Sequence, residues 1–255
     1  MRVAAALMSF ALPCLAATAQ AAGWQDLYQS SAIVTGTVAT TRADGLAQCL
    51  RDVLVKVSGN PALLDDPRVD ALGGTAAELV EDFAYLDRQS DMPRHDEQGS
   101  RDRPFTLIAH FAPTKIDAAL AALGEQPWRA DRPPLLVRIT VRDRNATFPM
   151  TADADADERQ RQALLASAER YGMRVVLLPK DRLAVGAAPP GSVPLDGTLT
   201  WSDAAFGWVG EWRLAWQGRD IAWGITGVSF DEAFRNAVRG AMGVLSGHAE
   251  AVSQH

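Results

Sequence analysis

The side chains that could carry out catalysis are scattered along this chain and do not form a recognisable set. His95 falls in a predicted loop, His110 on a predicted strand, and His248 and His255 near the C-terminus. No two of them have the spacing at which a helix presents two metal ligands. We therefore expect no metal site and no bound cofactor.

A serine-protease-like triad can be assembled on paper from Ser58, His110 and Asp117. Ser58, however, follows a predicted helix and lacks the flanking pair of glycines that forms a nucleophile elbow. The sequence thus leaves enzymatic activity undecided and favours its absence.

An acidic run, Asp-Ala-Asp-Ala-Asp-Glu over residues 153–158, is reminiscent of a calcium-binding loop. Aligning Asp153 with the first ligand position puts Glu158 where such a loop needs glycine, and Leu164 where it needs a bidentate glutamate. Acidic residues that precede a helix commonly cap it and interact favourably with its dipole. We interpret the run as the start of a helix.

Tryptophans provide the strongest candidate for a binding surface. Trp208, Trp212, Leu214 and Trp216 occupy alternate positions of one predicted strand, with Gly210 between the first two, so their side chains share one side of it. One interpretation is that this side packs on a C-terminal helix through Phe230 and Phe234. The other is an aromatic platform for sugar rings or an apolar peptide. The candidate ligand-binding residues are Trp201, Trp208, Trp212, Trp216 and Trp223.

Two groups of elements must position these side chains, and they predict an α+β fold. Residues 22–130 have the pattern of a β-α-α-β-β-α unit, with strands expected at 26–35, 83–88 and 104–111 and a short helix at about 75–82. Its longest helix carries an apolar face through Leu46, Leu50 and Val53, with Thr41 and Asp44 as a capping box and Gly59 as the stop.

A second unit is expected over residues 131–247, after the stiff Arg132-Pro133-Pro134 joint. Its pattern is that of a β-α-β-β-β-β-type α/β sandwich with a C-terminal helix. A strand at 135–141, a helix at 157–171 and a strand at 173–178 predict a parallel crossover. Three antiparallel strands are expected to follow at 195–201, 208–217 and 220–226. Ser229 and Glu232 form a capping box that starts the last helix. We expect residues 248–255 to be a frayed tail.

The first 21 residues have the features of a cleavable export signal. Arg2 supplies a positive start, an apolar run follows, and Ala19-Gln20-Ala21 is a typical cleavage site. The run is too short to cross a bilayer, which needs about 20 residues. A lipoprotein is the alternative, but Pro13 before Cys14 and the apolar residues after it disfavour lipidation. We expect cleavage near Ala21, a periplasmic location, and no transmembrane segment in the mature chain.

Composition narrows the range of partners. The formal net charge of -6 becomes about -7 when Arg2 is removed with the leader, which argues against nucleic acid as a partner. The mature chain keeps only Cys49, so it cannot form an internal disulfide. Cys49 lies within a predicted helix and is expected to be a small buried apolar residue; an intermolecular disulfide is the alternative.

Several segments resemble the domain-of-unknown-function family 2066 (DUF 2066) of secreted bacterial proteins. They are the Leu-Val-Lys-Val-Ser-Gly-Asn stretch at 54–60, the strand and helix at 105–123, Gly124-x-x-Pro-Trp128, and the restart at 132–137. That family has no assigned activity, so the resemblance transfers no catalytic residues to this chain.

Together these features favour an uncharacterised exported envelope protein that binds or scaffolds a partner in the periplasm without catalysis. One alternative is a module that binds glycan or peptidoglycan fragments through the tryptophan-lined strand. The other is a hydrolase with an unrecognised site, which would need a pocket where a carboxylate or histidine has a perturbed pKa. The partner would be an envelope protein or a glycan.

Overall fold

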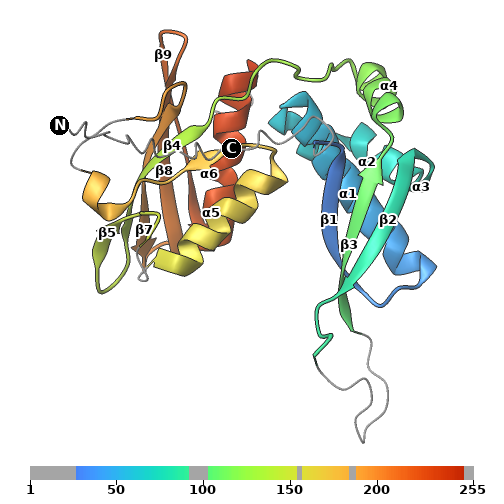
Figure 1. Cartoon of the computed structure of the whole chain (residues 1–255), viewed down its shortest axis with the longest axis horizontal. Coiled ribbons are helices and arrows are strands. Elements are labelled where there is room, and N and C mark those ends of the chain that lie inside the picture. Colours follow the sequence, from blue (N-terminus) through green and yellow to red (C-terminus); the bar gives the residue numbers. More distant parts are fainter. Residues whose placement is uncertain (1–26, 92–102, 154–156, 184–187, 250–255) are drawn as a thin grey trace, which may run out of the picture.

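A computed structural model describes residues 27–91, 103–153, 157–183 and 188–249. The predicted leader, its cleavage site and Cys14 lie outside the described residues, as do His95 and most of the predicted tail. Within the described ranges the chain has an α+β fold with two sheets, which confirms the predicted class (Figure 1).

The N-terminal unit contains a three-stranded antiparallel sheet in the order β1-β3-β2. Helix α1 packs on one face of this sheet, and the shorter helices lie around α1 and at the end of the sheet (Figure 1). The elements are β1 (Gln29–Thr35), α1 (Ala39–Ser58), the 3-10 helix η2 (Pro61–Asp65), α2 (Pro67–Gly73), α3 (Ala76–Leu79), β2 (Val80–Asp87), β3 (Pro104–Phe111) and α4 (Pro113–Leu123).

Helix α1 owes its position to the apolar face predicted from the sequence. Leu46, Leu50 and Val53 are all buried, and Gly59 ends the helix with a φ of 73°, a left-handed conformation that glycine adopts at little cost. The predicted capping box at Thr41 is wrong. The helix begins at Ala39, and the Thr41 hydroxyl donates to the carbonyl of Val38.

Strand β2 begins at Val80, three residues before the predicted Phe83. A register shift between Val80 and Asp82 lets the chain enter the sheet directly from α3, so the helix expected to continue to Asp82 stops at Leu79.

The C-terminal unit is built on a six-stranded mixed sheet in the order β5-β4-β7-β8-β9, with β6 also paired to β4. Strand β4 is parallel to β6 and β7, and β7, β8 and β9 are antiparallel to one another. The elements are β4 (Leu135–Arg142), β5 (Thr147–Pro149), α5 (Glu158–Arg170), β6 (Val175–Val176), η4 (Lys180–Arg182), β7 (Val193–Ser202), β8 (Gly207–Trp216), β9 (Arg219–Val228) and α6 (Phe230–Ser246).

The parallel crossover from β4 through α5 to β6 was predicted correctly, but β6 contains only two residues instead of the expected 173–178. Strand β5 was not predicted, because three residues are too few to show an alternating pattern. The capping box of α6 is present, since the Ser229 hydroxyl accepts from the Glu232 amide at 3.2 Å.

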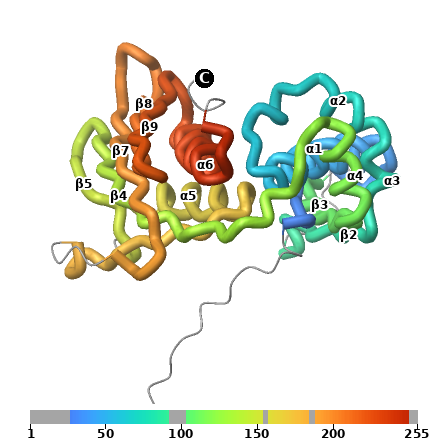
Figure 2. Tube along the Cα trace, turned by 90° about the horizontal axis from the view of Figure 1, so that it is seen from above, coloured from blue at the N-terminus to red at the C-terminus, as the bar shows by residue number. Residues whose placement is uncertain are grey.

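The two helices of the C-terminal unit, α5 and α6, lie on the face of the six-stranded sheet that is turned toward the N-terminal unit (Figure 2). The opposite face is polar and carries exposed ion pairs, among them Arg138 with Asp196 at 2.6 Å. The order across the molecule is therefore sheet, helix layer, N-terminal unit.

Buried side chains from both units form one apolar cluster. The division of the chain near residue 130 stays a prediction. The predicted tail begins with residues that pack on the protein: the His248 amide donates to the Gly243 carbonyl at 2.7 Å, and Ala249 is buried.

Candidate functional site

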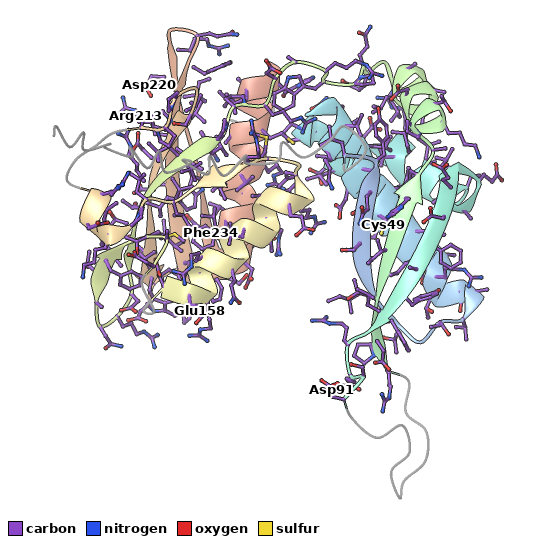
Figure 3. All side chains as sticks on the ribbon, in the orientation of Figure 1. Cys49, Asp91, Glu158, Arg213, Asp220 and Phe234 are labelled. Atoms are coloured by element: carbon purple, nitrogen blue, oxygen red, sulfur yellow. The ribbon has the colours of Figure 1, made fainter. Side chains whose placement is uncertain are left out.

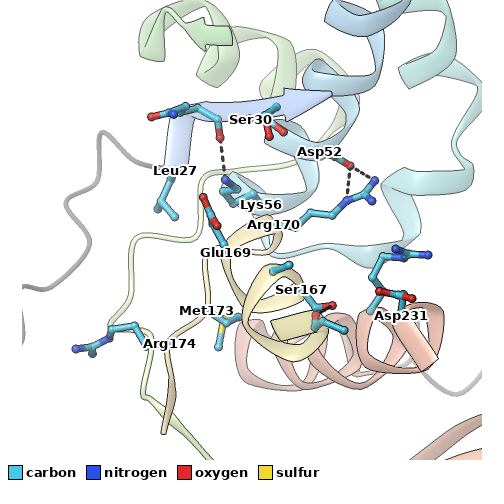
Figure 4. Close-up of a pocket in the computed structure, with 16 residues that line it drawn as sticks. Leu27, Ser30, Asp52, Lys56, Ser167, Glu169, Arg170, Met173, Arg174 and Asp231 are labelled. Carbon is cyan, nitrogen blue, oxygen red and sulfur yellow. Dashed lines mark hydrogen bonds and ion pairs between the residues drawn. The ribbon is translucent and has the colours of Figure 1, made fainter. Parts of the chain in front are cut away.

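A cavity of about 560 Å³ lies between the two units, within the size range of small-ligand sites (Figure 4). One wall comes from the N-terminal unit and contains β1 residues 29–31 together with Asp52 and Lys56 of α1. The other wall comes from α5, the turn after it, and the start of α6, with Ser167, Arg170, Met173, Asp231 and Arg235 among its residues.

An ion pair between the two units lies in the cavity. Arg170 of α5 donates from Nε and Nη2 to Asp52 Oδ1 of α1, at 3.1 and 2.6 Å. The Asp52 side chain is only 3% exposed, while that of Arg170 is 32% exposed. Burial raises the pKa of Asp52 above its usual range, and Arg170 offsets part of this rise. Asp52 in turn helps to raise the pKa of Arg170.

Lys56 lies one helical turn after Asp52 and belongs to the same wall. Its Nζ donates to the backbone carbonyl of Gln29 at 2.8 Å, so the buried lysine holds the first residue of β1 against α1. Figure 4 shows this contact and the Asp52–Arg170 pair on the two sides of the same space.

The linker between the units is fastened by Arg132, which the sequence identified only as part of a stiff joint. Its Nη2 donates to the Lys56 carbonyl at 2.7 Å, and its guanidinium stacks on the Trp128 ring at 4.3 Å from the centroid. Burial lowers the pKa of Arg132 to about 10. The Trp128 amide also donates to the Val57 carbonyl at 2.8 Å. The end of α1 and the linker are thus held together.

Cys49 is fully buried in α1, as predicted for a small apolar residue (Figure 3). Burial raises the pKa of its thiol to about 12, and the nearby Asp52 carboxylate adds to the rise. The thiol is therefore protonated at neutral pH and has no access to a second molecule.

The five candidate tryptophans share one face of the six-stranded sheet. Trp201 is directly opposite Trp208, and Trp212 is directly opposite Trp223, in the strand register. Trp208, Trp212 and Trp223 are buried, whereas Trp201 and Trp216 are half-buried. A binding role for these five residues stays a prediction.

Helix α6 covers the centre of this tryptophan face. The Trp212 Nε1 donates to Asn236 Oδ1 at 3.0 Å, and the Trp223 Nε1 donates to the Asn236 carbonyl at 3.1 Å. The Trp212 ring also lies 6.4 Å from that of Phe234, centroid to centroid. Trp212 and Trp223 therefore belong to the packing between sheet and helix, which is the first of the two interpretations offered above.

The structure does not assemble the nominal triad. Ser58 Oγ donates to the Leu54 carbonyl at 2.7 Å. His110 Nδ1 lies 3.3 Å from Asp82 Oδ1. Asp117 accepts from the Tyr28 hydroxyl at 2.8 Å and from Arg129 at 2.6 Å.

The acidic run leads directly into α5, which begins at Glu158, so the predicted helix start is confirmed. Asp157, however, makes no side-chain cap to the helix. Its buried carboxylate accepts from the Thr151 amide at 2.9 Å and pairs with Arg161 at 2.8 Å. Asp153 accepts from the Lys180 amide at 3.0 Å. These two carboxylates thus tie together the segments around them. Residues 154–156 lie outside the described residues.

Sequence reasoning missed the cavity residues Asp52 and Lys56. A usable signal was present, since two opposite charges four residues apart interrupt the apolar run of α1 between Cys49 and Ser58. Charged side chains are rarely buried without partners, so this pair indicated a second element packed against it.

Within the described ranges, His, Cys, Asp and Glu side chains form no group of three or more that could hold a metal ion. None of the helices in these ranges combines the length and apolar composition needed to cross a membrane.

Comparison with known families corrects the resemblance inferred from the sequence. Residues 21–129 match the model of a different family, described as Domain of unknown function (DUF8605), and not DUF 2066. Most of the segments behind the earlier resemblance lie inside this match, and a helix closed by glycine or a strand followed by a helix is too common to separate two families. No curated protein and no solved structure matches the chain.

Proposed function

We propose that this protein is an exported, non-enzymatic binding protein of the bacterial periplasm, and that the cavity between its two units holds the ligand. The observation that carries the proposal is the cavity itself, whose two walls come from different units and offer both charged and neutral polar groups. Sites of this kind occur preferentially between domains.

The state of the charged groups supports binding over catalysis. Asp52 is engaged by Arg170, and Lys56 is engaged by the Gln29 carbonyl. Both contacts hold parts of the protein together, so proton transfer by either group would disturb the structure that forms the cavity. Groups fixed in this way are suited to positioning a ligand.

One specific observation favours the second candidate, a hydrolase. Asp52 combines a cavity position with a pKa raised by burial, which is the feature expected of a general acid or base. Incubating the protein with peptidoglycan fragments and chromogenic esters tests this candidate. Turnover that is lost in Asp52→Asn while the variant stays folded would replace the binding proposal.

For the glycan-binding alternative, two of the candidate tryptophans are only half-buried and could contact a sugar ring. They are Trp201 and Trp216. Arg144 already stacks on the Trp201 ring at 4.7 Å from its centroid. A fluorescence titration with muropeptides tests it: a saturable shift that Trp216→Phe removes would support a site on this face.

Export is part of the proposal and is supported by the leader-like pattern of residues 1–21. N-terminal sequencing of the protein recovered from a periplasmic extract is expected to begin at Ala22. An uncleaved chain found in the cytoplasmic fraction would contradict export.

Site-specific photocrosslinking in intact cells tests the binding site. A benzophenone amino acid replaces Ala166, an exposed cavity residue. In a matched variant it replaces Phe206, which is 91% exposed in the turn between β7 and β8 and does not line the cavity. We expect a crosslinked species from position 166 and none from position 206. Equal crosslinking from both positions, or none from 166, would contradict the proposal.

A further inference from the structure

Strand β1 is an edge strand with no strand beside its outer edge in the part of the chain that the structure describes. The order β1-β3-β2 gives it one neighbour, β3. Its sequence, Gln-Ser-Ser-Ala-Ile-Val-Thr, contains no charge and no proline, and its pairing with β3 runs through seven residues without a shift. Such an edge is a template for another strand.

The register shows which backbone groups are available at this edge. The Gly36 amide donates to the Arg103 carbonyl at 2.8 Å, so the even-numbered residues of β1 direct their backbone groups toward β3. The odd-numbered residues therefore direct theirs away from the sheet. Lys56 occupies the Gln29 carbonyl, which leaves the amides and carbonyls of Ser31, Ile33 and Thr35.

Other sheet edges in the described residues carry the features that normally prevent strand addition. Strand β2 has a register shift at its start and the acidic residues Glu81, Asp82 and Asp87. Strand β5 is three residues long and ends in Pro149. Strand β9 begins with Arg219 and Asp220 and has a shift near its end. By comparison, β1 is unprotected.

The cavity provides room at this same edge. Gln29, Ser30 and Ser31 line it, and α5 forms the opposite wall (Figure 4). A volume of about 560 Å³ suits a short segment of chain more than the sheet of a folded domain. Beyond the cavity, Ile33 is 62% exposed on the uncovered face of the sheet.

We propose that the ligand is an extended peptide segment that binds along β1 and becomes the fourth strand of the N-terminal sheet. This inference rests on the proposed function and names its ligand class. Main-chain hydrogen bonds to Ser31, Ile33 and Thr35 hold the peptide, as in other cases of strand addition. The peptide alternates, with an apolar residue beside Ile33 and polar residues toward the cavity.

The test begins with heptapeptides selected from a displayed random library on the folded full-length protein. Their dissociation constants are then measured for the wild type, Ser31→Pro and Ser31→Ala. Proline removes the outward amide of Ser31 without removing a bond to β3, and edge strands tolerate proline at such positions. We expect Ser31→Pro to weaken binding at least about tenfold, equivalent to about 1.4 kcal/mol, and Ser31→Ala to change it less than about twofold.

Hydrogen exchange identifies the bound backbone directly. The amides of Ser31, Ile33 and Thr35 are expected to gain protection when a selected peptide is added. If Ser31→Pro fails to fold by circular dichroism, Ser31→Lys replaces it, since a charged side chain also blocks an edge.

Several outcomes overturn strand addition. One is a selection that yields no peptide with a dissociation constant below about 100 µM, and another is equal peptide affinity of Ser31→Pro and the wild type. The others are hydrogen-exchange protection that lies outside β1, and a dimer of this chain that Ser31→Pro abolishes. If position 166 still crosslinks in cells, the cavity remains a binding site and only the peptide is excluded. If position 166 gives no crosslink either, the proposed function fails as well.

Discussion

Asp52 and Arg170 are unequal partners, because the carboxylate is buried and the guanidinium is not fully so. Removing the arginine leaves a buried carboxylate without its hydrogen-bonded counterion, whereas removing the carboxylate leaves an arginine with access to water. We expect Arg170→Met to lower the free energy of unfolding by about 3 kcal/mol at pH 7, and Asp52→Asn by about 1 kcal/mol. Urea unfolding measures both.

The pH dependence of these variants follows from the raised pKa of Asp52. A carboxyl group whose pKa is higher in the folded than in the unfolded protein stabilises the fold when it is protonated. This contribution is fully present below the unfolded pKa of about 3.9 and is lost as the pH rises through the folded pKa. Arg170→Met raises that folded pKa further, so its deficit relative to wild type should shrink at pH 4. If Arg170→Met loses the same unfolding free energy at pH 4 and at pH 7, the raised pKa is not that of Asp52.

We expect the Cys49 thiol to be unreactive in the native protein. Its pKa of about 12 and complete burial leave almost no thiolate at pH 8. Ellman's reagent should react at the rate of global unfolding, and a rate that rises in urea with the unfolded fraction would support this. Rapid stoichiometric reaction of the folded protein would contradict this expectation. An intermolecular disulfide through Cys49 would then again be an alternative.

Helix α6 depends on glycine where it approaches β9. A Cβ atom at Gly240 would lie 2.2 Å from Trp223 Nε1. Alanine normally favours a helix interior by about 1 kcal/mol over glycine, but here we expect Gly240→Ala to destabilise by about 2 kcal/mol through overpacking. Thermal unfolding measures the change.

Gly74 provides the matched control for this substitution. It has a right-handed helical conformation, and a Cβ atom there would meet only the Ala71 carbonyl at an ordinary 3.6 Å. Gly74→Ala should be neutral or stabilising. If both alanines raise the melting temperature, the close contact between α6 and Trp223 is not a constraint.

The sequence was sufficient for the elements whose signals are local. Apolar periodicity located α1, α4, α5 and α6, and the alternation that includes the tryptophans located β8 and the side of it that they share. Local patterns did not give the short strand β5 and overestimated the length of β6, because both strands depend on pairing with β4. They also did not give the cavity, because the partners Asp52 and Arg170 are 118 residues apart.

Gly172 allows the two units to approach each other. Its φ is 60°, and a Cβ atom there would lie 2.6 Å from Leu27 Cδ2 and 3.0 Å from Lys56 Cγ, both in the N-terminal unit. We expect Gly172→Ala to cost about 3 kcal/mol, combining the left-handed conformation with the collision. Equilibrium urea unfolding gives the value.

Gly124→Ala separates the two contributions. Gly124 has a φ of 84° with no atom within 4 Å of its Cβ position, so alanine there should cost only the conformational part, about 1 kcal/mol. Equal losses at Gly172 and Gly124 would mean that the contact between the units adds nothing.

Helix α6 follows every described strand in the sequence, yet it covers the tryptophan face of the large sheet, and its Ser246 hydroxyl donates to the Gly59 carbonyl in the other unit at 2.7 Å. During synthesis, the nascent chain must therefore hold Trp212 and its neighbours exposed until the last helix leaves the ribosome. This delay keeps the chain open to chaperones, and a premature stop before residue 230 would release an aggregation-prone product.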